Sequence, residues 1–339
     1  PTRRSSDLFK LTFEPMQSYI ISLEKESEIE TETKIEIETE TKNSVYKIEK
    51  SEQTVQLQQN WNIDRMELNS MTLDCCTYRI DNGELQGPIP VIKLQSILLD
   101  LRRSCEIEIR FNFNIDMDLA MNQEFYAVVE DASIYRIQVN GTQIHYEEIG
   151  YWKDKTFKKV AIKSAIMSGK NEIILKTTFK QPQKVYDVLY GENVYETEKN
   201  KITYDIEIES IYLLGDFGVV SETPYKQIDR KAMVTNGPFT IINQPKEFTS
   251  NDFTTNGLTF FAGQIVVSQG LEITKELGKR VILNLQKQNA PLIKVYVNDR
   301  LVKDSLWAPY TADVTDYVTD GMNKVTLHIF ASNRNLFGP

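Results

Sequence analysis

The stretch PLIKVYVNDRLVKDSLWAPYTADVTDYVTDGMNKVTLHIF, residues 291–330, decides the fold expected for this chain. It begins with alternating apolar residues at 292–297 and turns at Asn298 and Asp299. An aromatic loop and a Gly-x-Asn turn then precede a second apolar segment at 325–330. Period-two alternation rich in β-branched residues is typical of half-buried strands, and Asn and Gly tolerate the positive φ of hairpin turns. The stretch therefore predicts part of a β-sandwich.

A weaker copy of the same order occupies residues 133–179. Each copy has a strand ending in an Asn turn, a tryptophan, an aspartate, and a Gly-x-Asn turn before a closing strand. The alignment pairs 137–141 with 295–299, Trp152 with Trp307, Asp154 with Asp313, and 169–173 with 321–325. We expect both Asn turns and both tryptophans to serve the fold, with the tryptophan closing one end of the sandwich.

Short strand-like segments separated by turn residues every 8 to 12 positions fill most of the rest of the chain. This spacing favours an all-β architecture with few helices. We expect two consecutive β-sandwiches, at 55–218 and 219–339, the second truncated at its C-terminal end. Residues 91–103 fit either a helix or a strand followed by a turn.

Composition excludes some classes of function. The 339 residues include 39 Lys and Arg against 48 Asp and Glu, a net charge of −9. Nucleic acid is not expected as a partner, because phosphate binding needs clustered positive charge. No apolar run approaches the ~20 residues of a membrane-spanning helix. Three cysteines without paired spacing form neither a disulfide framework nor a zinc site, and slightly favour a cytoplasmic location.

The N-terminal region divides into three parts. Residues 1–8 resemble translated sequencing-adapter sequence, and 9–23 fit the tail of an upstream domain. Residues 24–54 are acidic and rich in Glu and Thr, and fit either a strand hairpin or a disordered linker. We therefore expect an internal fragment of a longer protein.

The order V-N-G/D, aromatic loop, D-V-T-D-Y-V, G-x-N and strand, followed by Asn333-Arg334-Asn335-Leu336-Phe337-Gly338-Pro339, resembles a known family. It is similar to the galactose-binding-like jelly-roll domains of large bacterial glycoside hydrolases, such as the family 2 sugar-binding domain. The resemblance covers about 55–339. It implies a multidomain enzyme of carbohydrate metabolism whose catalytic domain lies upstream and would be a partner of this region in the same chain. It also implies that a structural calcium is compatible with the fold, with no ligand set identifiable; no other cofactor is expected.

Sugars are held by aromatic faces and by planar polar side chains that bond their hydroxyls. The residues that fit this chemistry for carbohydrate binding or interdomain contact are Trp307, Tyr310, Arg334, Asn335 and Trp152. The alternative is that the aromatics close loops or pack against the catalytic domain. Glu207 and Glu209 share one strand face, which we interpret as solvated, and Asp313 and Asp316 as turn caps. No catalytic residue and no metal ligand is assigned.

These observations predict a non-catalytic, carbohydrate-binding or supporting β-sandwich region of a glycoside hydrolase, inactive by itself. The alternative is a free-standing carbohydrate-binding or adhesive surface protein. The sequence upstream of Phe9 distinguishes them, because it would encode a catalytic domain in the first case and a secretion signal or further repeats in the second.

Overall fold

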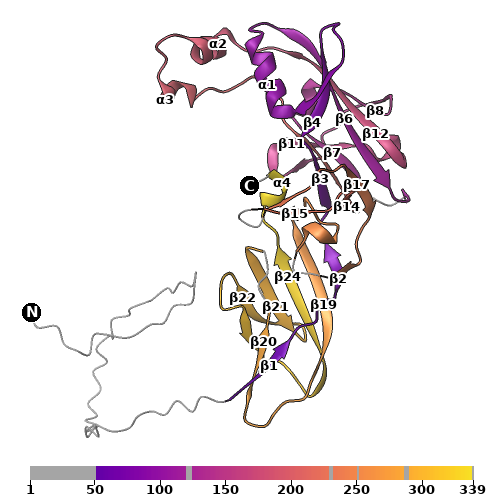
Figure 1. The fold of residues 1–339 in the computed structure, drawn as a ribbon, viewed down its shortest axis with the longest axis vertical. Helices are drawn as coiled ribbons and strands as arrows, with labels where there is room; N and C mark the ends of the chain where they lie inside the picture. Colours follow the sequence, from indigo (N-terminus) through magenta and orange to yellow (C-terminus); the bar gives the residue numbers. More distant parts are fainter. Residues whose placement is uncertain (1–50, 120–123, 229–231, 250–251, 286–289, 338–339) are drawn as a thin grey trace, which may run out of the picture. The chain divides into compact units, whose positions relative to one another are not determined.

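The computed structural model describes residues 51–119, 124–228, 232–249, 252–285 and 290–337 (Figure 1). These residues form strands in several sheets and only four short α-helices, which confirms the all-β sandwich class. In the described part of the chain, no helix has the length and apolar character to cross a membrane. The expectations for residues 1–8, 9–23 and most of 24–54 fall outside the described residues. The last residues of that linker range enter strand β1 (Glu52–Gln56).

The described residues form two compact units. Unit 1 contains residues 51–61 and Val266–Ile329, and unit 2 contains Asn62–Ile265 and the residues from Phe330 onward. The expected division into 55–218 and 219–339 differs from these units, because its boundary falls inside strand β14 (Phe217–Ser221). That strand pairs with β17 (Phe239–Asn243), which in turn runs parallel to β6 (Cys105–Asp116), so residues beyond 218 complete a sheet of unit 2.

Unit 2 contains two main sheets. One sheet has the order β10-β11-β7-β13-β3, formed by Tyr151–Trp152, Asp154–Ala161, Phe125–Glu130, Ile211–Gly215 and Asn69–Leu73. The other has the order β14-β17-β6-β12-β8-β9, where β12 is Gly169–Phe179, β8 Arg136–Val139 and β9 Thr142–Ile144. Strands β4 (Cys75–Ile80) and β5 (Gln86–Pro90) extend it through β6. Two short pairs complete the unit: β15 (Lys226–Gln227) with β16 (Met233–Val234), and β18 (Glu247–Phe248) with β2 (Trp61–Met66).

Alternation along these strands builds the core of unit 2. In β7 the fully buried residues Phe125, Ala127 and Val129 join the large apolar cluster, and in β13 Ile211 and Leu213 do the same. Alternate residues of β6, among them Phe111, bring the other sheet's side chains into the same cluster. Residues one position away along β7 and β13 point to the opposite face, because successive side chains of a strand alternate. Each side of the five-stranded sheet therefore has its own packing.

Residues 91–103 contain a helix, α1 (Val91–Asp100), which settles the ambiguity left by the sequence. Its buried residues Val91, Leu94 and Leu98 recur every three to four positions, which places them on one helical face. Helices α2 (Gln183–Tyr190) and α3 (Glu196–Lys199) were not predicted. Three-residue 3-10 turns occur at Ala132–Ile134, Lys163–Ala165 and Thr254–Asn256.

Two strand-like segments of the sequence do not form continuous strands. Of the segment 201–214, only its end forms a strand, β13, while Ile206 and Ile208 are buried in an irregular segment that enters it. Residues 258–261 form turns, with one isolated bridge between Leu258 and Val219. In both segments apolar residues are buried in the core without a continuous partner strand. Apolar residues at strand-like spacing therefore did not identify a hydrogen-bonded strand pair here.

Unit 1 is built from two further sets of strands. The first has the order β19-β24-β21-β22, formed by Gln264–Ile273, Gly321–Phe330, Leu292–Val297 and Arg300–Ser305. The second has the order β1-β20-β23, where β20 is Arg280–Asn284 and β23 is Thr311–Asp313. Fully buried residues from both sets, including Val295, Leu327 and Leu283, form its apolar interior.

The repeat predicted from the sequence is present in both topology and hydrogen bonding. Strands β6-β12-β8-β9 of unit 2 follow each other in the same sheet order as β19-β24-β21-β22 of unit 1. The Asn140 amide donates to Oδ1 of Asn171 at 2.8 Å, and its own Oδ1 accepts from the backbone of Glu172. Asn298 makes the same two bonds, to Asn323 at 2.9 Å and from the backbone N–H of Lys324.

Part of the predicted alignment was wrong. The Asn140 amide also donates to the carbonyl of Ala165, whereas the Asn298 amide donates to that of Tyr317, so these two carbonyls are equivalent. Asp313 lies four residues before Tyr317, and Ala161 lies four residues before Ala165. Asp313 therefore corresponds to Ala161 and not to Asp154. Trp152 and Trp307 are then also not equivalent. The two Asn pairs are separated by 31 and 25 residues, so the copy in unit 2 is longer by six. The extra residues lie in the hairpin that includes Trp152 and Asp154.

Candidate functional site

The outer face of the five-stranded sheet of unit 2 carries a second apolar cluster. Tyr212, Val128 and Leu214 point to this side, opposite to the main core, and Leu336 from helix α4 (Arg334–Phe337) packs on them. The Thr72 hydroxyl donates to the carbonyl of Leu336 at 3.1 Å and fixes the helix to strand β3. In β7 the same alternation places Glu130 on this outer face, two residues beyond Val128.

Aromatic rings surround Tyr212 on this face. The ring centroids of Trp152 and Phe157 lie 5.7 and 5.6 Å from that of Tyr212, and Phe337 of α4 lies 6.0 Å from it with an edge-on ring. Phe157 and Phe337 are 6.5 Å apart. Tilted and edge-on rings at such distances are favourable arrangements of aromatic quadrupoles. The long hairpin and the chain's last helix are thus joined through one aromatic group.

A pocket of about 530 Å³ opens beside this aromatic group. Its lining combines aromatic side chains, carboxylates, an amide and one lysine. These residues are Glu130, Lys153, Asp154, Thr156, Phe157, Glu207, Glu209, Asn333 and Phe337. The volume is in the range of small-molecule sites, and the lining is mostly polar, with two aromatic rings among its residues.

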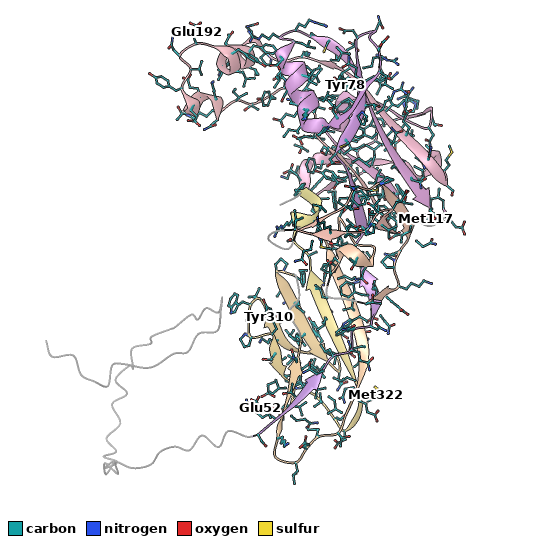
Figure 2. The ribbon with its side chains drawn as sticks, viewed as in Figure 1. Glu52, Tyr78, Met117, Glu192, Tyr310 and Met322 are labelled. Carbon is teal, nitrogen blue, oxygen red and sulfur yellow. The ribbon has the colours of Figure 1, made fainter. Side chains whose placement is uncertain are left out.

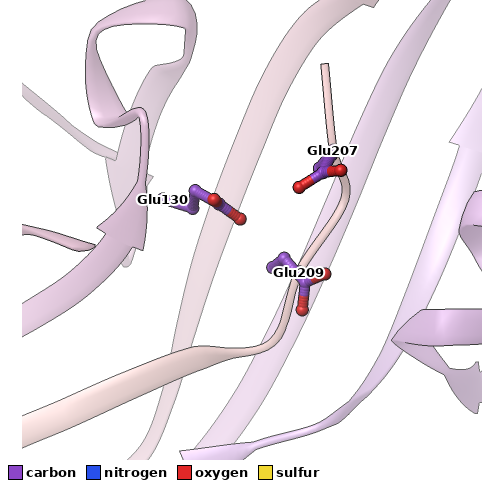
Figure 3. A group of neighbouring side chains, drawn as sticks. All are labelled: Glu130, Glu207 and Glu209. Carbon is purple, nitrogen blue, oxygen red and sulfur yellow. The ribbon is translucent and has the colours of Figure 1, made fainter. Parts of the chain in front are cut away.

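Three carboxylates meet at this pocket (Figure 3). Glu130 ends strand β7, while Glu207 and Glu209 lie in the irregular segment that enters β13. One oxygen from each carboxylate lies within 4.8 Å of the others. Their directions follow from the anchoring of Ile206 and Ile208 in the core, since alternation turns the intervening glutamates away from it. Glu207 and Glu209 are both exposed, as interpreted from the sequence, and their face is also one side of a shared acidic cluster.

Like charges so close together repel each other and disfavour ionisation. Burial, followed by the charges of Glu209, Glu207 and Asp131, raises the pKa of Glu130 to about 7, although a hydrogen bond from Thr156 acts in the opposite direction. The pKa of Glu209 is also raised, first by burial and then by Glu207. Two unit charges about 4 Å apart repel by ~1 kcal/mol in water and by ~4 kcal/mol near a protein surface. Glu130 therefore changes between its protonated and its ionised form near neutral pH.

Other titratable groups around the cluster also have raised pKa values. Tyr212 has its pKa raised to about 12 by burial and by Glu209 and Glu130. The pKa of Tyr135 is raised by burial and by Glu130. Neither phenol is ionised at neutral pH, so neither adds charge.

The lysine of the pocket bonds a backbone carbonyl and not one of the three glutamates. Lys153 Nζ donates to the carbonyl of Ala262 and lies 5.5 Å from the centre of the Trp152 ring. Burial lowers the pKa of Lys153. Across the described residues, no Lys, Arg or His side chain forms an ion pair with Glu130, Glu207 or Glu209. The acidic cluster is uncompensated.

In the described part of the chain, these three glutamates also form the group of side chains whose spacing could hold a metal ion. Calcium takes six to eight oxygen ligands at 2.3–2.6 Å, and oxygens within 4.8 Å of one another fit around an ion of that size. Three carboxylates supply only part of such a shell. The residues present thus fit a calcium ion in charge and spacing, with the remaining ligands to come from water.

The candidate residues chosen from the sequence are divided between the units. Trp307, 38% exposed, and half-buried Tyr310 lie in the β22–β23 loop of unit 1. Trp152 joins the aromatic group of unit 2, and Arg334 and Asn335 belong to α4, between the pocket residues Asn333 and Phe337. The structure thus groups these last three residues around one helix and hairpin. Figure 2 marks Tyr310 within unit 1.

Sequence reasoning missed Glu130, Phe157 and Phe337. A signal existed for Glu130, because it is an acidic residue directly after the apolar run Phe125–Val129. Nothing in the sequence indicated that this strand end lies beside the segment of Glu207 and Glu209, about 80 residues later. That neighbourhood depends on β13 pairing with β7.

No protein-family profile matches the chain, and no curated protein matches it. Solved structures do match in part. The rhamnosidase from Novosphingobium sp. PP1Y gives a TM-score of 0.24 at 14% identity, covering 76% of this chain and 21% of its own. The Streptomyces avermitilis α-L-rhamnosidase complexed with L-rhamnose gives 0.29 at 12%, covering 78% and 24%.

The Bifidobacterium dentium β-glucuronidase gives a TM-score of 0.28 at 11% identity, covering 83% of this chain and 44% of its own. The chain spans less than half the length of these glycoside hydrolases. TM-scores of this size establish neither a common fold nor a common activity.

Proposed function

We propose that this chain is a non-catalytic β-sandwich region of a glycoside hydrolase, and that the pocket of unit 2 binds carbohydrate. The proposal joins the sequence resemblance to sugar-binding jelly rolls with the lining of that pocket. In a longer protein, the region would support the glycan site of a catalytic domain elsewhere in the chain.

The combination of side chains in one pocket carries the proposal. Phe157 and Phe337 offer ring faces and edges to the apolar C–H surface of a sugar ring. The Asn333 amide and the carboxylates offer donors and acceptors to its hydroxyls. Phe337 is 53% exposed, so it is available to a ligand.

Hydrolysis needs two carboxyl groups on opposite sides of a scissile bond, ≈ 5–5.5 Å apart in retaining and ≈ 6.5–9.5 Å apart in inverting glycosidases. One oxygen from each of Glu130, Glu207 and Glu209 lies within 4.8 Å of the others, so the three carboxylates converge and can share one ligand group. The raised pKa of Glu130 comes first from burial and then from the charges of Glu209, Glu207 and Asp131.

A second surface belongs to the same proposal. Trp307, Leu306 and Leu301 of unit 1 are 38%, 49% and 47% exposed. The Lys303 ammonium donates to the carbonyls of Pro309 and Thr311 at 3.0 and 2.7 Å and so fixes the loop that carries Trp307. We assign this surface to contact with a neighbouring domain or with an extended glycan.

Saturation-transfer NMR on the whole chain with neutral methyl glycosides tests sugar binding, and the variant Phe337→Ala tests its place. Phe337 is largely exposed, so the variant should fold, and binding should weaken ~5- to 30-fold, as expected for loss of one aromatic contact worth about 1–2 kcal/mol. Tyr195→Ala is the matched control, because Tyr195 is a 76% exposed aromatic residue of the same unit outside the pocket.

Two results would overturn the proposal. One is the absence of saturation transfer to any glycoside. The other is release of product from aryl glycosides by the purified chain, lost in Glu130→Gln, which would make the acidic cluster an active site.

A further inference from the structure

The pocket of unit 2 carries an imbalance of charge that would govern which sugars enter it. Four of its lining residues are acidic: Glu130, Glu207, Glu209 and Asp154. Its lysine, Lys153, is withdrawn to the carbonyl of Ala262 and the face of Trp152. The described residues around the glutamates supply no ion pair to neutralise them.

We propose, on the premise that this pocket binds carbohydrate, that it selects sugars bearing a positively charged amine and excludes sugars bearing a carboxylate. Two features act together in this selection. The ring of Phe157 or Phe337 covers the apolar face of the sugar, and the glutamates receive the ammonium group as charge-assisted hydrogen-bond acceptors. An aromatic surface next to carboxylates is also favourable for a cation, because the ring face is electron-rich.

The arrangement of the glutamates supports this class of ligand. Their oxygens lie within 4.8 Å of one another, so one ammonium group, which has three donors, can reach all three. A neutral hydroxyl would leave the repulsion within the cluster unrelieved, whereas an ammonium group relieves it. A uronic acid would add a further negative charge to those of Glu207, Glu209 and Asp154.

Asp154 holds its place independently of a ligand. Its Oδ1 accepts from the backbone N–H and the hydroxyl of Thr156 at 2.9 and 2.8 Å. Phe157, the next residue, pairs with Glu130 in the β11–β7 ladder, so the hairpin and the end of β7 are connected at this point. The carboxylates thus come from three segments that are already connected before a ligand binds.

The test compares three sugars of similar size on the whole chain at about pH 6: methyl glucoside, glucosamine and glucuronate. We expect glucosamine to bind ~10-fold more tightly than methyl glucoside, and glucuronate to bind more weakly than both. The preference for glucosamine should shrink on raising the ionic strength from ~0.01 to ~1 M, because exposed charges are screened over a shorter distance.

Variants test whether the glutamates of the pocket cause the preference for glucosamine. The double variant Glu207→Gln, Glu209→Gln should reduce the ratio of glucosamine affinity to methyl glucoside affinity by ~5-fold or more. Glu192→Gln, an exposed glutamate of the same unit outside the pocket, is the matched control. Calcium chloride forms a further arm, since competition between calcium and glucosamine at the same carboxylates supports the shared preference for positive charge.

Four outcomes would overturn the inference. Equal binding of glucosamine and methyl glucoside would overturn it and leave the proposed function standing, as would binding of glucuronate equal to that of glucosamine. If calcium binds and glucosamine does not compete with it, the glutamates would form a metal site and not a site for a sugar amine. Failure of all three sugars to bind would overturn the proposed function and the inference together.

Discussion

The Asn140 amide donates to Oδ1 of Asn171 at 2.8 Å across 31 residues of sequence, and joins the turn after β8 to the start of β12. Asn171 is 3% exposed, and its amide donates to the carbonyls of Met167 and Gly169 at 2.7 and 2.9 Å. Unit 1 repeats this arrangement with Asn298 and Asn323. Each unit is thus closed by a pair of amides that bond each other and the nearby backbone, and the second of each pair, Asn171 or Asn323, is buried.

The first prediction concerns this Asn pair. Asn171→Ala should lower the free energy of unfolding by about 3 kcal/mol, because it leaves several buried polar groups without partners at ~1–3 kcal/mol each. Asn112→Ala is the control, since Asn112 is exposed and lies opposite Glu172 on the neighbouring strand; it should change stability by less than ~0.5 kcal/mol. Urea unfolding measures both, and equal effects would contradict the role of the amide.

The second prediction concerns stability and pH at Glu130. Its pKa of about 7 in the folded chain lies above the ~4.3 of an unfolded glutamate, so the folded state holds the proton more tightly. Below ~pH 4, Glu130 is protonated in both the folded and the unfolded chain. As pH rises from ~4 to ~7, the unfolded chain loses this proton first, so the stability of the folded chain declines. Glu130→Gln should therefore be neutral at ~pH 4 and stabilising by ~1–2 kcal/mol at ~pH 8, after allowance for solvent screening.

Thermal unfolding of Glu130→Gln over this pH range checks the sign, with Glu192→Gln as the control that should follow the parent chain throughout. A variant less stable than the parent at high pH would show that the Glu130 charge is compensated, contrary to the structure.

Glu108 supports the opposite prediction. Partial burial acts to raise its pKa, but hydrogen bonds from Lys176 and Arg110, at 2.7 and 2.6 Å, outweigh burial and lower it. Its stabilising effect is present above the unfolded pKa of ~4.3 and is lost as pH falls further. Glu108→Gln should cost ~1–2 kcal/mol at ~pH 7 and little at ~pH 3. A pH-independent difference in urea unfolding would contradict this assignment.

The loop of Trp307 gives a fourth prediction. Lys303→Met removes both donors to the carbonyls of Pro309 and Thr311, so amide hydrogen exchange over residues 306–311 should become faster by ~5-fold or more, the equivalent of one lost hydrogen bond. Lys294→Met is the control, because Lys294 pairs with Asp304 on the same two strands and bonds no loop carbonyl. Unchanged exchange in Lys303→Met would show that the loop is held by other contacts.

The sequence predicted the class of fold and much of the repeat because both depend on local patterns. Alternation along 292–297 matches β21 to the residue, and the two Gly-x-Asn turns signalled the paired amides. The tryptophan alignment failed because it matched residue types across a hairpin of unequal length, which only the hydrogen-bond register resolves.

None of the residues selected from the sequence lines the pocket, although three of them lie near it. Trp152, Arg334 and Asn335 were selected as sugar-binding types, and they lie on the hairpin and helix that form the pocket. Glu130 was not, since its environment is created by β7 pairing with β13 about 80 residues away. Glu207 and Glu209 are exposed, as interpreted, but alternation indicates only which side a residue faces and could not show that Glu130 faces the same side.

Titration of the intact 339-residue chain with methyl glucoside and glucosamine, observed by saturation-transfer NMR alongside Phe337→Ala, tests the central claim most directly. The account predicts binding of both sugars, weaker binding of both to Phe337→Ala, and no turnover of aryl glycosides. Binding that is unchanged in Phe337→Ala, or hydrolysis that depends on Glu130, would contradict it.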